Sequence, residues 1–135
     1  MRKTIFIVDD SDTNLTQAEE VLEDHYTVIT MSSAEKMFHL IDKKTPNLIL
    51  LDIEMPEMDG LEAMERLQAD NRLSAIPVIF LTGQREAATE TRCFEMGAAD
   101  FIGKPFTAPG LLRRVKTQLC LRELLSKYLS ERKCR

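Results

Sequence analysis

The amino-acid sequence predicts an α/β domain built on a doubly wound parallel sheet of five strands. Short apolar runs alternate along the chain with longer segments in which apolar residues recur at helical spacing, the pattern typical of βα repeats. The chain has 135 residues, of which 44% are hydrophobic. This length suffices for one domain with a buried core and is too short for two.

The apolar runs define the expected strands, and the segments between them define the expected helices. We expect strands near residues 4–8, 26–30, 47–51, 77–82 and 99–102. We expect helices over 13–24, over 33–43, from Gly60 onward and over 85–96. Local signals agree with these limits: Ser33 is placed to cap a helix, Gly97 to end one, and Pro46 and Pro77 precede strands.

A fifth helix is predicted to continue to the end of the chain, because its apolar pattern runs from Leu111 to Leu129. That is longer than a sheet of five βα units requires. We therefore divide the chain into a domain over residues 1–120 and a helical extension over residues 121–135 that continues the fifth helix. Another surface is expected to cover the apolar side of this extension.

Charge is distributed unevenly along the chain. The formal net charge is -4 at pH 7, but residues 1–112 carry a net -10 and residues 113–135 a net +6. A basic helical tail is most often a solvated helix face, so we expect no direct nucleic-acid binding. No apolar run reaches the roughly 20 residues that cross a bilayer, and no signal-peptide pattern follows Met1. We expect a cytoplasmic protein without a membrane partner.

The three cysteines are predicted to be reduced, structural thiols. Cys93, Cys120 and Cys134 are an odd number without close spacing. Neither His25 nor His39 stands at a zinc-ligand interval from them. A disulfide framework and a zinc site are therefore both disfavoured.

Five polar side chains are predicted at the ends of the strands. Asp9 and Asp10 follow the first apolar run, Asp52 the third, Thr82 the fourth and Lys104 the fifth. The carboxyl ends of parallel strands meet at one edge of an open sheet, where ligands bind. Three carboxylates there repel one another unless a cation is present, and an all-oxygen cluster suits Mg²⁺. The sequence therefore predicts a magnesium site at this edge.

Short motifs at the same strand ends carry a resemblance to a known family. They are Asp9-Asp10, Asp52, Met55-Pro56, Met58-Asp59-Gly60, Thr82-Gly83 and Lys104-Pro105-Phe106. Taken alone, each has an ordinary reading as a turn, a cap or a surface loop. Taken together and in this order, they make nearly the whole chain similar to the receiver domain of two-component response regulators. The resemblance implies a flavodoxin-like sheet with strand order 2-1-3-4-5.

The resemblance also implies a phosphorylation site. Asp52 would accept a phosphoryl group from a phosphohistidine of a sensor histidine kinase or a histidine phosphotransfer protein. Asp10, with Asp9 behind it, would hold Mg²⁺ together with Asp52 and the backbone carbonyl of Glu54. The expected protein assists its own phosphorylation and slow dephosphorylation, and is not an enzyme that turns over a separate substrate.

Two further residues are implied to pass the signal on. Lys104 and Thr82 would contact the remaining phosphoryl oxygens. Thr82 would move toward the phosphoryl group, and Phe101 would swing inward behind it, remodelling the face formed by the fourth helix, fifth strand and fifth helix. Phe101 stands where the family more often has tyrosine, so we predict a switch driven by packing alone. An ordinary core role is the alternative for Phe101.

The rim of the site is expected to contain Glu54, Gly83 and Gln84. Glu54 and Gln84 lie two residues past Asp52 and Thr82, and we hypothesise that they set the lifetime of the acyl phosphate. Solvent-exposed residues without a role are the alternative. Gly83, which has no side chain, would leave the phosphoryl site reachable, although glycine after a strand is equally a plain turn.

Two other protein classes share parts of this pattern. Magnesium-dependent phosphatases of the haloacid-dehalogenase type also use a strand-end aspartate, and Asp10-Ser11-Asp12-Thr13-Asn14 departs from their motif only at its last position. A flavodoxin-like cofactor binder needs a first loop that cradles phosphate, whereas the acidic loop here repels phosphate without a metal. The phosphatase is the stronger of the two alternatives.

The output of the domain is left open by the sequence. No known output motif follows residue 106, so the chain is either a stand-alone receiver that contacts a downstream protein or the N-terminal regulatory part of a longer protein. The Leu-rich side of the last helix could pair with a second copy. Asp100 and Arg114 could form an ion pair between the subunits of such a homodimer, although Gly110 stands where that pattern expects an acid.

Overall fold

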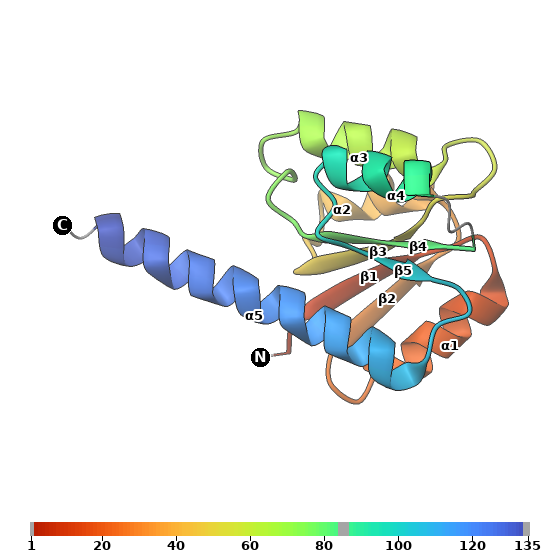
Figure 1. Cartoon of the computed structure of the whole chain (residues 1–135), viewed down its shortest axis with the longest axis horizontal. Coiled ribbons are helices and arrows are strands. Elements are labelled where there is room, and N and C mark those ends of the chain that lie inside the picture. The colour runs from red at the N-terminus through yellow and green to blue at the C-terminus, as the bar shows by residue number, and fades with distance from the viewer. Residues whose placement is uncertain (1, 84–86, 134–135) are drawn as a thin grey trace.

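The fold is an open, fully parallel sheet with helices on both of its faces (Figure 1). The structure is a computed structural model and describes residues 2–83 and 87–133. The strands are β1 (Thr4–Val8), β2 (Thr27–Met31), β3 (Leu48–Asp52), β4 (Val78–Thr82) and β5 (Asp100–Gly103). They lie in the order β2-β1-β3-β4-β5, which confirms the predicted sheet, and each strand limit falls within one residue of its prediction.

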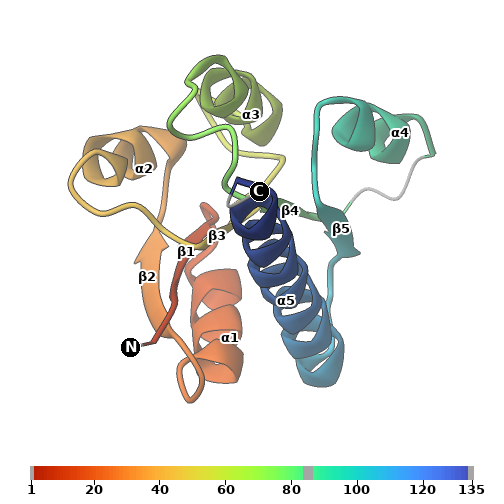
Figure 2. The ribbon, with the colours of Figure 1, turned by 90° about the vertical axis from the view of Figure 1, so that its left-hand side faces the viewer.

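The helices form two layers (Figure 2). They are α1 (Asp12–Leu22), α2 (Ala34–Ile41), α3 (Gly60–Ala69), α4 (Ala87–Glu95) and α5 (Ala108–Lys133). One face of the sheet is covered by α1 and α5, and the other by α2, α3 and α4. The first helix ends two residues before its predicted limit, because the backbone N–H groups of His25 and Tyr26 turn back to the Leu22 carbonyl at 3.0 Å. The predicted start of the fourth helix at residue 85 lies outside the described residues.

Polar side chains fix where the helices begin. The side chains of Ser11, Ser33 and Asp59 each accept a hydrogen bond from a backbone N–H in the first turn of α1, α2 and α3. The predicted cap at Ser33 is thereby confirmed. Gly97 follows α4 with a positive φ of 97°, a backbone conformation that glycine adopts at little cost, so this helix also ends as predicted.

Successive residues of the central strands point into two separate apolar cores. One core lies under α2, α3 and α4 and includes Phe6, Ile49 and Phe80. The other lies under α1 and α5 and includes Ile7, Leu50 and Ile79. Because both faces of these strands are buried, their sequences are continuous apolar runs and not alternating ones.

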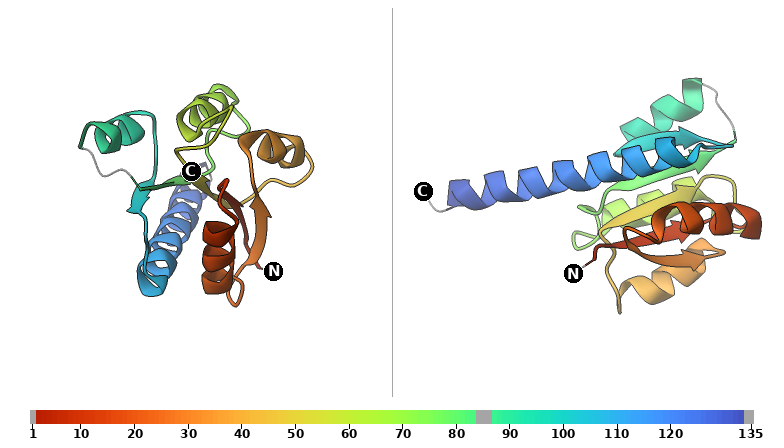
Figure 3. Two further views of the ribbon diagram at one scale, coloured as in Figure 1. Left: turned by 90° about the vertical axis from the view of Figure 1, so that its right-hand side faces the viewer. Right: turned by 90° about the horizontal axis from the view of Figure 1, so that it is seen from below.

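The last helix packs on the sheet only along its first half. Leu111, Val115 and Leu119 are buried against the sheet and α1. An ion pair of 2.6 Å between Lys3 Nζ and Glu123 Oε1 ties the start of β1 to the helix just beyond them. From there α5 projects away from the rest of the domain (Figures 1 and 3). The division between residues 120 and 121 stays a prediction.

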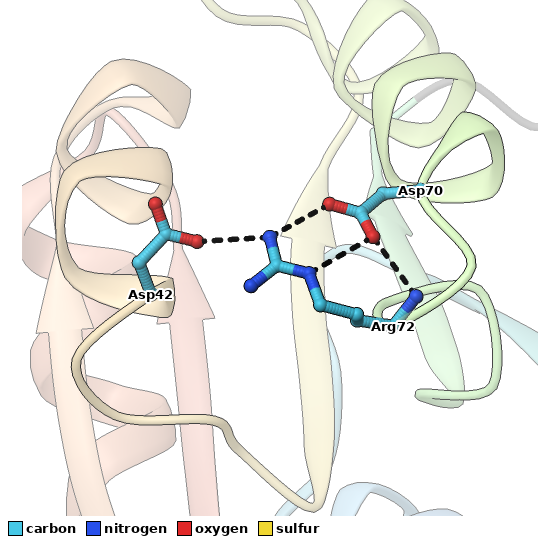
Figure 4. A network of polar contacts seen from close by, with 3 residues as sticks. All are labelled: Asp42, Asp70 and Arg72. Atoms are coloured by element: carbon cyan, nitrogen blue, oxygen red, sulfur yellow. Dashed lines mark hydrogen bonds and ion pairs between the residues drawn. The ribbon is translucent and has the colours of Figure 1, made fainter.

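Arg72 joins α2 to the loop that follows α3 (Figure 4). Its guanidinium donates to both carboxylate oxygens of Asp70, at 3.0 and 3.3 Å, and to Asp42 at 3.2 Å. These hydrogen bonds lower the pKa of the Asp70 carboxyl from its ordinary value. Because all three side chains face solvent, we assign the network to holding the loop in place and not to a large gain in stability.

The prediction that the cysteines are reduced, structural thiols can be compared with the fold. Cys93 and Cys120 are free thiols, as predicted; Cys93 is buried, whereas Cys120 is exposed, so the predicted structural role is not supported by burial at Cys120. Cys134 lies outside the described residues.

None of the helices in the described part of the chain has the length and apolar composition that a membrane crossing requires.

The end of the packed part of α5 can be tested by truncating single leucines. Leu119 is 5% exposed and Leu124 is 63% exposed on the same helix. We expect Leu119→Ala to lower the free energy of unfolding by about 2–4 kcal/mol, because it leaves a cavity, and Leu124→Ala to change it by less than about 0.5 kcal/mol. Urea unfolding in dilute solution measures both; equal losses would contradict this limit.

Candidate functional site

The predicted polar residues meet at the carboxyl edge of the sheet. Asp9 follows β1 and is fully buried, whereas its neighbour Asp10 is exposed. Asp52 and Thr82 are the last residues of β3 and β4 and are almost completely buried. Lys104 follows β5, and its backbone N–H donates to the Thr82 carbonyl at 2.7 Å, which continues the strand pairing past the end of β5.

Lys104 connects the two buried carboxylates. Its ammonium nitrogen lies 3.0 Å from Asp52 Oδ1 and 3.1 Å from Asp9 Oδ2. Only 18% of the lysine side chain is exposed, so both contacts lie in a region that water reaches poorly. Low water content strengthens such charge-assisted contacts and also makes each charge costly to leave without a partner.

The acidic residues also form a group that could hold a metal ion. One carboxylate oxygen from each of Asp9, Asp10 and Asp52 can be chosen so that all three lie within 4.8 Å of one another. Asp9 Oδ2 is buried and, although Lys104 is near, receives no hydrogen bond from any described residue. The Lys104 ammonium at 3.1 Å is shared with Asp52, so these buried carboxylates together carry more negative charge than Lys104 neutralises, and a hard cation with oxygen ligands would supply the rest. The residues present therefore fit Mg²⁺.

The electrostatics of the site raise the pKa of Asp52. Burial is the largest cause, and the neighbouring carboxylate of Asp9 adds to it, while the hydrogen bond from Lys104 works in the opposite direction. The resulting pKa of Asp52 is about 7 without a metal ion. Burial alone would lower the pKa of Lys104, but its contacts with Asp52 and Asp9 raise it. Lys104 therefore remains an ammonium, and a cation at the acidic group would favour ionised Asp52.

The loop after β3 lies close against the Asp52 backbone. The backbone N–H of Gly60 donates to the Ile53 carbonyl at 2.8 Å. A Cβ atom at Gly60 would overlap the Asp52 carbonyl oxygen, so only glycine fits there. This role was missed from the sequence, where Gly60 was noted only as part of a motif. Asp59, immediately before Gly60, caps the start of α3. The sequence signal that could have indicated the role of Gly60 is this helix-capping aspartate followed directly by glycine.

The remaining predicted residues lie at different depths around this edge. Glu54 is exposed in the loop after β3, and Gly83 is exposed with no atom within 4 Å of an added Cβ. Gln84 lies outside the described residues. Phe101 is 9% exposed and packs in the core under α2, α3 and α4, paired in register with Phe80 of β4. Phe101 thus already occupies an inward position.

One ion pair that the sequence suggested is present within the chain. Arg114 on α5 contacts both carboxylate oxygens of Asp100, at 2.9 and 3.0 Å, within the same chain. Asp100 Oδ1 also accepts from the backbone N–H of Phe101 at 2.8 Å. Within the chain the pair holds α5 against β5, and the expectation of an ion pair between subunits at these residues stays a prediction.

The fold and the acidic edge place the chain among open α/β proteins whose strand-end carboxylates can hold a cation. Comparison with known proteins narrows this class. The sequence pattern of the response regulator receiver domain matches residues 5–116. The chain belongs to the response regulator receiver domain family, as its motifs predict. This match decides between the receiver and the haloacid-dehalogenase interpretations in favour of the receiver.

Individual relatives show how the domain is used in other proteins. A probable cyclic di-GMP phosphodiesterase of Vibrio cholerae is 38% identical over 116 residues, covering 86% of this chain and 26% of that protein. The polar-differentiation response regulator DivK of Brucella ovis is 32% identical over 120 residues, covering 88% of this chain and 98% of DivK. The crystal structure of NtrX from Brucella abortus superposes with a TM-score of 0.91 at 26% identity, covering 98% of this chain and 30% of NtrX. The chain thus spans less than two thirds of two of these relatives and nearly all of the third.

The raised pKa of Asp52 predicts how stability depends on pH without metal. Between the ordinary value of 3.8 and about 7, the folded protein keeps a proton on Asp52 that the unfolded chain has lost. The free energy of unfolding is therefore expected to fall as pH rises from roughly 5 to 8, and Asp52→Asn should remove roughly 1–3 kcal/mol of that fall.

Urea unfolding in EDTA at the two pH values measures this difference. Asp24→Asn, which removes an exposed carboxylate far from the site, is the matched control. Equal pH slopes for the wild type and Asp52→Asn would contradict the assignment of the raised pKa.

Proposed function

We propose that this receiver domain accepts a phosphoryl group from a phosphohistidine onto Asp52 and so acts as a signalling switch. The observation that carries the proposal is the contact of Lys104 with both Asp52 and Asp9 at a strand edge that also contains Asp10. Family membership supports it, because phosphorylation-dependent signalling is the role in which response regulators use this domain. The donor would be a sensor histidine kinase or a histidine phosphotransfer protein.

The transfer needs an ionised acceptor and a neutralised phosphoryl group. A carboxylate oxygen of Asp52 attacks phosphorus, the P–N bond to the histidine breaks, and its electron pair returns to the imidazole nitrogen, which takes up a proton. Lys104 keeps its proton and, with the Thr82 hydroxyl, contacts the phosphoryl oxygens as they gain charge. Asp52 stays at the end of β3 throughout, so the chain contributes position and charge more than covalent chemistry.

Mg²⁺ is the proposed cofactor, held by the carboxylates of Asp9, Asp10 and Asp52 together with the backbone carbonyl of Glu54. The buried carboxylates of Asp9 and Asp52, which share the Lys104 ammonium, support this assignment. When bound, the ion neutralises negative charge shared between the acceptor and the phosphoryl group. Asp10, the exposed member of the group, lies where an incoming ion would first meet the site.

We further propose that the domain does not turn over a separate substrate and that it works in the cytoplasm through protein contacts. DivK, which the chain matches over 98% of its length, supports a stand-alone receiver. The Vibrio relative, of which the chain spans 26%, supports the alternative of a regulatory part in a longer protein with its own output. In both cases the downstream partner is a protein or a protein domain.

Phosphorylation of Asp52 can be tested directly by mass. Incubation with Mg²⁺ and a small acyl phosphate such as acetyl phosphate should add one phosphoryl mass to the intact protein. Asp52→Asn should abolish the addition, and EDTA should reduce it at least about tenfold, because the acidic group then lacks its cation. Asp24→Asn is the control with an unaltered site. Equal phosphorylation of the Asp52→Asn variant would contradict the proposal.

Thr82 and Phe101 are the proposed switch residues. Phe101 is already packed inward, so phosphorylation would stabilise this side-chain position relative to other positions of the ring. Thr82 would move toward the phosphoryl group at the same time. A phenyl ring has no hydroxyl for a new hydrogen bond, so the coupling depends on packing against Phe80 and its core neighbours. The face formed by α4, β5 and α5 would change as a result.

The packing switch predicts a specific loss in Phe101→Ala. Beryllofluoride with Mg²⁺, a phosphoryl mimic, should slow hydrogen exchange in α4 and β5 of the wild type. Phe101→Ala should reduce that slowing at least about threefold, because the cavity uncouples Thr82 from the surface. Phe94→Ala, which removes a 47% exposed phenylalanine from α4, is the matched control. An unchanged response in Phe101→Ala would exclude this mechanism.

The lifetime of the phosphorylated state is proposed to depend on Glu54 and Gln84. Glu54 is exposed two residues past Asp52, where its carboxylate can orient or repel an attacking water. Glu54→Ala is therefore expected to change the decay rate at least about twofold on a phosphate-affinity gel. Glu57→Ala, in the same loop, is the control. Identical decay in the wild type and Glu54→Ala would show that Glu54 has no such role.

A further inference from the structure

Gly60, the first residue of α3, lies directly against the end of β3. A Cβ atom at this residue would overlap the Asp52 carbonyl oxygen and would lie 2.8 Å from the Ile53 Cα and 3.0 Å from the Asp52 carbonyl carbon. All three atoms belong to the backbone, so none of them can rotate away as the end of a side chain could. A side chain at residue 60 would therefore push α3 and the strand end apart by roughly 0.5–1 Å, the shift that restores ordinary contact distances.

Backbone conformation does not explain this glycine. Of the glycines in the described part of the chain, only Gly97 has a positive φ, so Gly60 does not occupy the left-handed region that disfavours alanine. Alanine is also preferred to glycine within helices. Local preference would thus favour alanine at residue 60, and the requirement for glycine comes from the space beside Asp52.

The contact closes a loop that contains a proposed metal ligand. The loop spans residues 53–59, and it includes Glu54, whose backbone carbonyl is proposed to bind Mg²⁺. The Gly60 N–H donates to the Ile53 carbonyl at 2.8 Å, and the Ile53 N–H donates to the Leu81 carbonyl of β4 at 3.1 Å. The backbone of Ile53 is thus bonded to the sheet on one side and to the start of α3 on the other.

Both ends of this loop are anchored. Ile53 and Met55 are buried in the core under α2, α3 and α4, whereas Glu54 between them is exposed. The Glu54 backbone therefore cannot move far without disturbing buried side chains. At the other end of the loop, the Asp59 side chain accepts a hydrogen bond of 2.9 Å from a backbone N–H in the first turn of α3. The contact at residue 60 sets the distance between the two ends.

Magnesium binding is sensitive to such a distance. Mg²⁺ requires nearly ideal octahedral coordination, with bonds to oxygen of about 2.0–2.1 Å. Asp52 ends β3 and Glu54 lies in the loop that Gly60 closes, so a shift of α3 against the strand end would move one proposed ligand relative to the other. A shift of roughly 0.5 Å is large compared with the tolerance of this geometry.

We propose that Gly60 is a positioning residue for Mg²⁺. The space that it leaves beside Asp52 lets the loop hold the Glu54 carbonyl where it can bind the same ion as the Asp52 carboxylate. The inference rests on the proposed function, because it concerns the same cofactor and the same acceptor. Gly60 acts through the backbone of the loop and is not itself a ligand, so its substitution should change metal affinity beyond any effect on stability.

Titration of the full chain with MgCl₂, followed by the amide NMR signals of Asp10 and Glu54, tests the proposal. A parallel titration with NaCl corrects for ionic strength. Gly60→Ala should raise the Mg²⁺ dissociation constant at least about tenfold, because the added Cβ displaces the loop. Ala63→Gly, at a fully buried position of the same helix, is the matched control: it should lower stability but keep the dissociation constant within about twofold of the wild type. Circular dichroism verifies that both variants are folded.

A measurement on the wild type tests the same coupling without any substitution, and it applies even if Gly60→Ala does not fold. If the Gly60 contact favours Mg²⁺ binding, bound Mg²⁺ must equally favour the contact, since coupling between two sites is reciprocal. Saturating Mg²⁺ should therefore slow hydrogen exchange of the Gly60 N–H at least about threefold. The Lys44 N–H, which donates to the Leu40 carbonyl at 3.0 Å at the end of α2, is the control and should exchange at an unchanged rate.

The outcomes separate this inference from the proposed function. Equal Mg²⁺ affinity of Gly60→Ala and the wild type, or equal weakening by Ala63→Gly, would overturn the inference and leave the proposed phosphorylation intact. An unchanged exchange rate of the Gly60 N–H in Mg²⁺ would do the same. No response of the wild type to MgCl₂ would overturn the proposed cofactor and this inference together.

Discussion

Lys104 reaches across the carboxyl edge of the sheet to contact Asp52 and Asp9 where little water is present. Two carboxylates and one ammonium leave this buried group with an excess negative charge, and Asp10 adds another at the surface. Such an arrangement is costly in a closed core and is retained only if something else supplies positive charge or if a carboxylate takes up a proton. The site is therefore poised to respond to a cation and to any change in charge at Asp52.

The rest of the domain maintains that arrangement against its own repulsion. Two apolar cores hold β1, β3 and β4 from both faces, so Asp9, Asp52 and Thr82 cannot separate without disturbing buried side chains. The backbone hydrogen bond from Lys104 to Thr82 fixes the lysine to the same sheet. Gly60 lets the loop after β3 close over the Asp52 carbonyl. Rigidity of the scaffold is what allows like charges to stay together.

The sequence predicted the parts of the molecule that depend on local patterns. Apolar runs ending in Asp9, Asp52 and Thr82 located the sheet and its charged edge, since strand ends in a parallel sheet share one side. It could not predict which charges pair when several partners are within reach. Arg72 bridges Asp42 and Asp70, for example, because tertiary packing sets those distances.

Exposure was equally hard to predict where it depends on shape. Cys120 and Leu119 are neighbours in an apolar helix, yet one faces solvent and the other the core. The close contact between the Gly60 backbone and the Asp52 carbonyl joins the two ends of the loop after β3. No periodic pattern in the sequence indicates such a contact. The contacts of an individual residue therefore depend on the three-dimensional structure, whereas the order of the helices and strands could be predicted from the sequence.

The continuity of α5 has a mechanical consequence. The helix begins four residues after Lys104 and runs unbroken for 26 residues, a length of about 39 Å. A tilt of about 5° at its first turn would displace its far end by about 3 Å. A small rearrangement beside the lysine can therefore be delivered as a larger displacement well outside the domain.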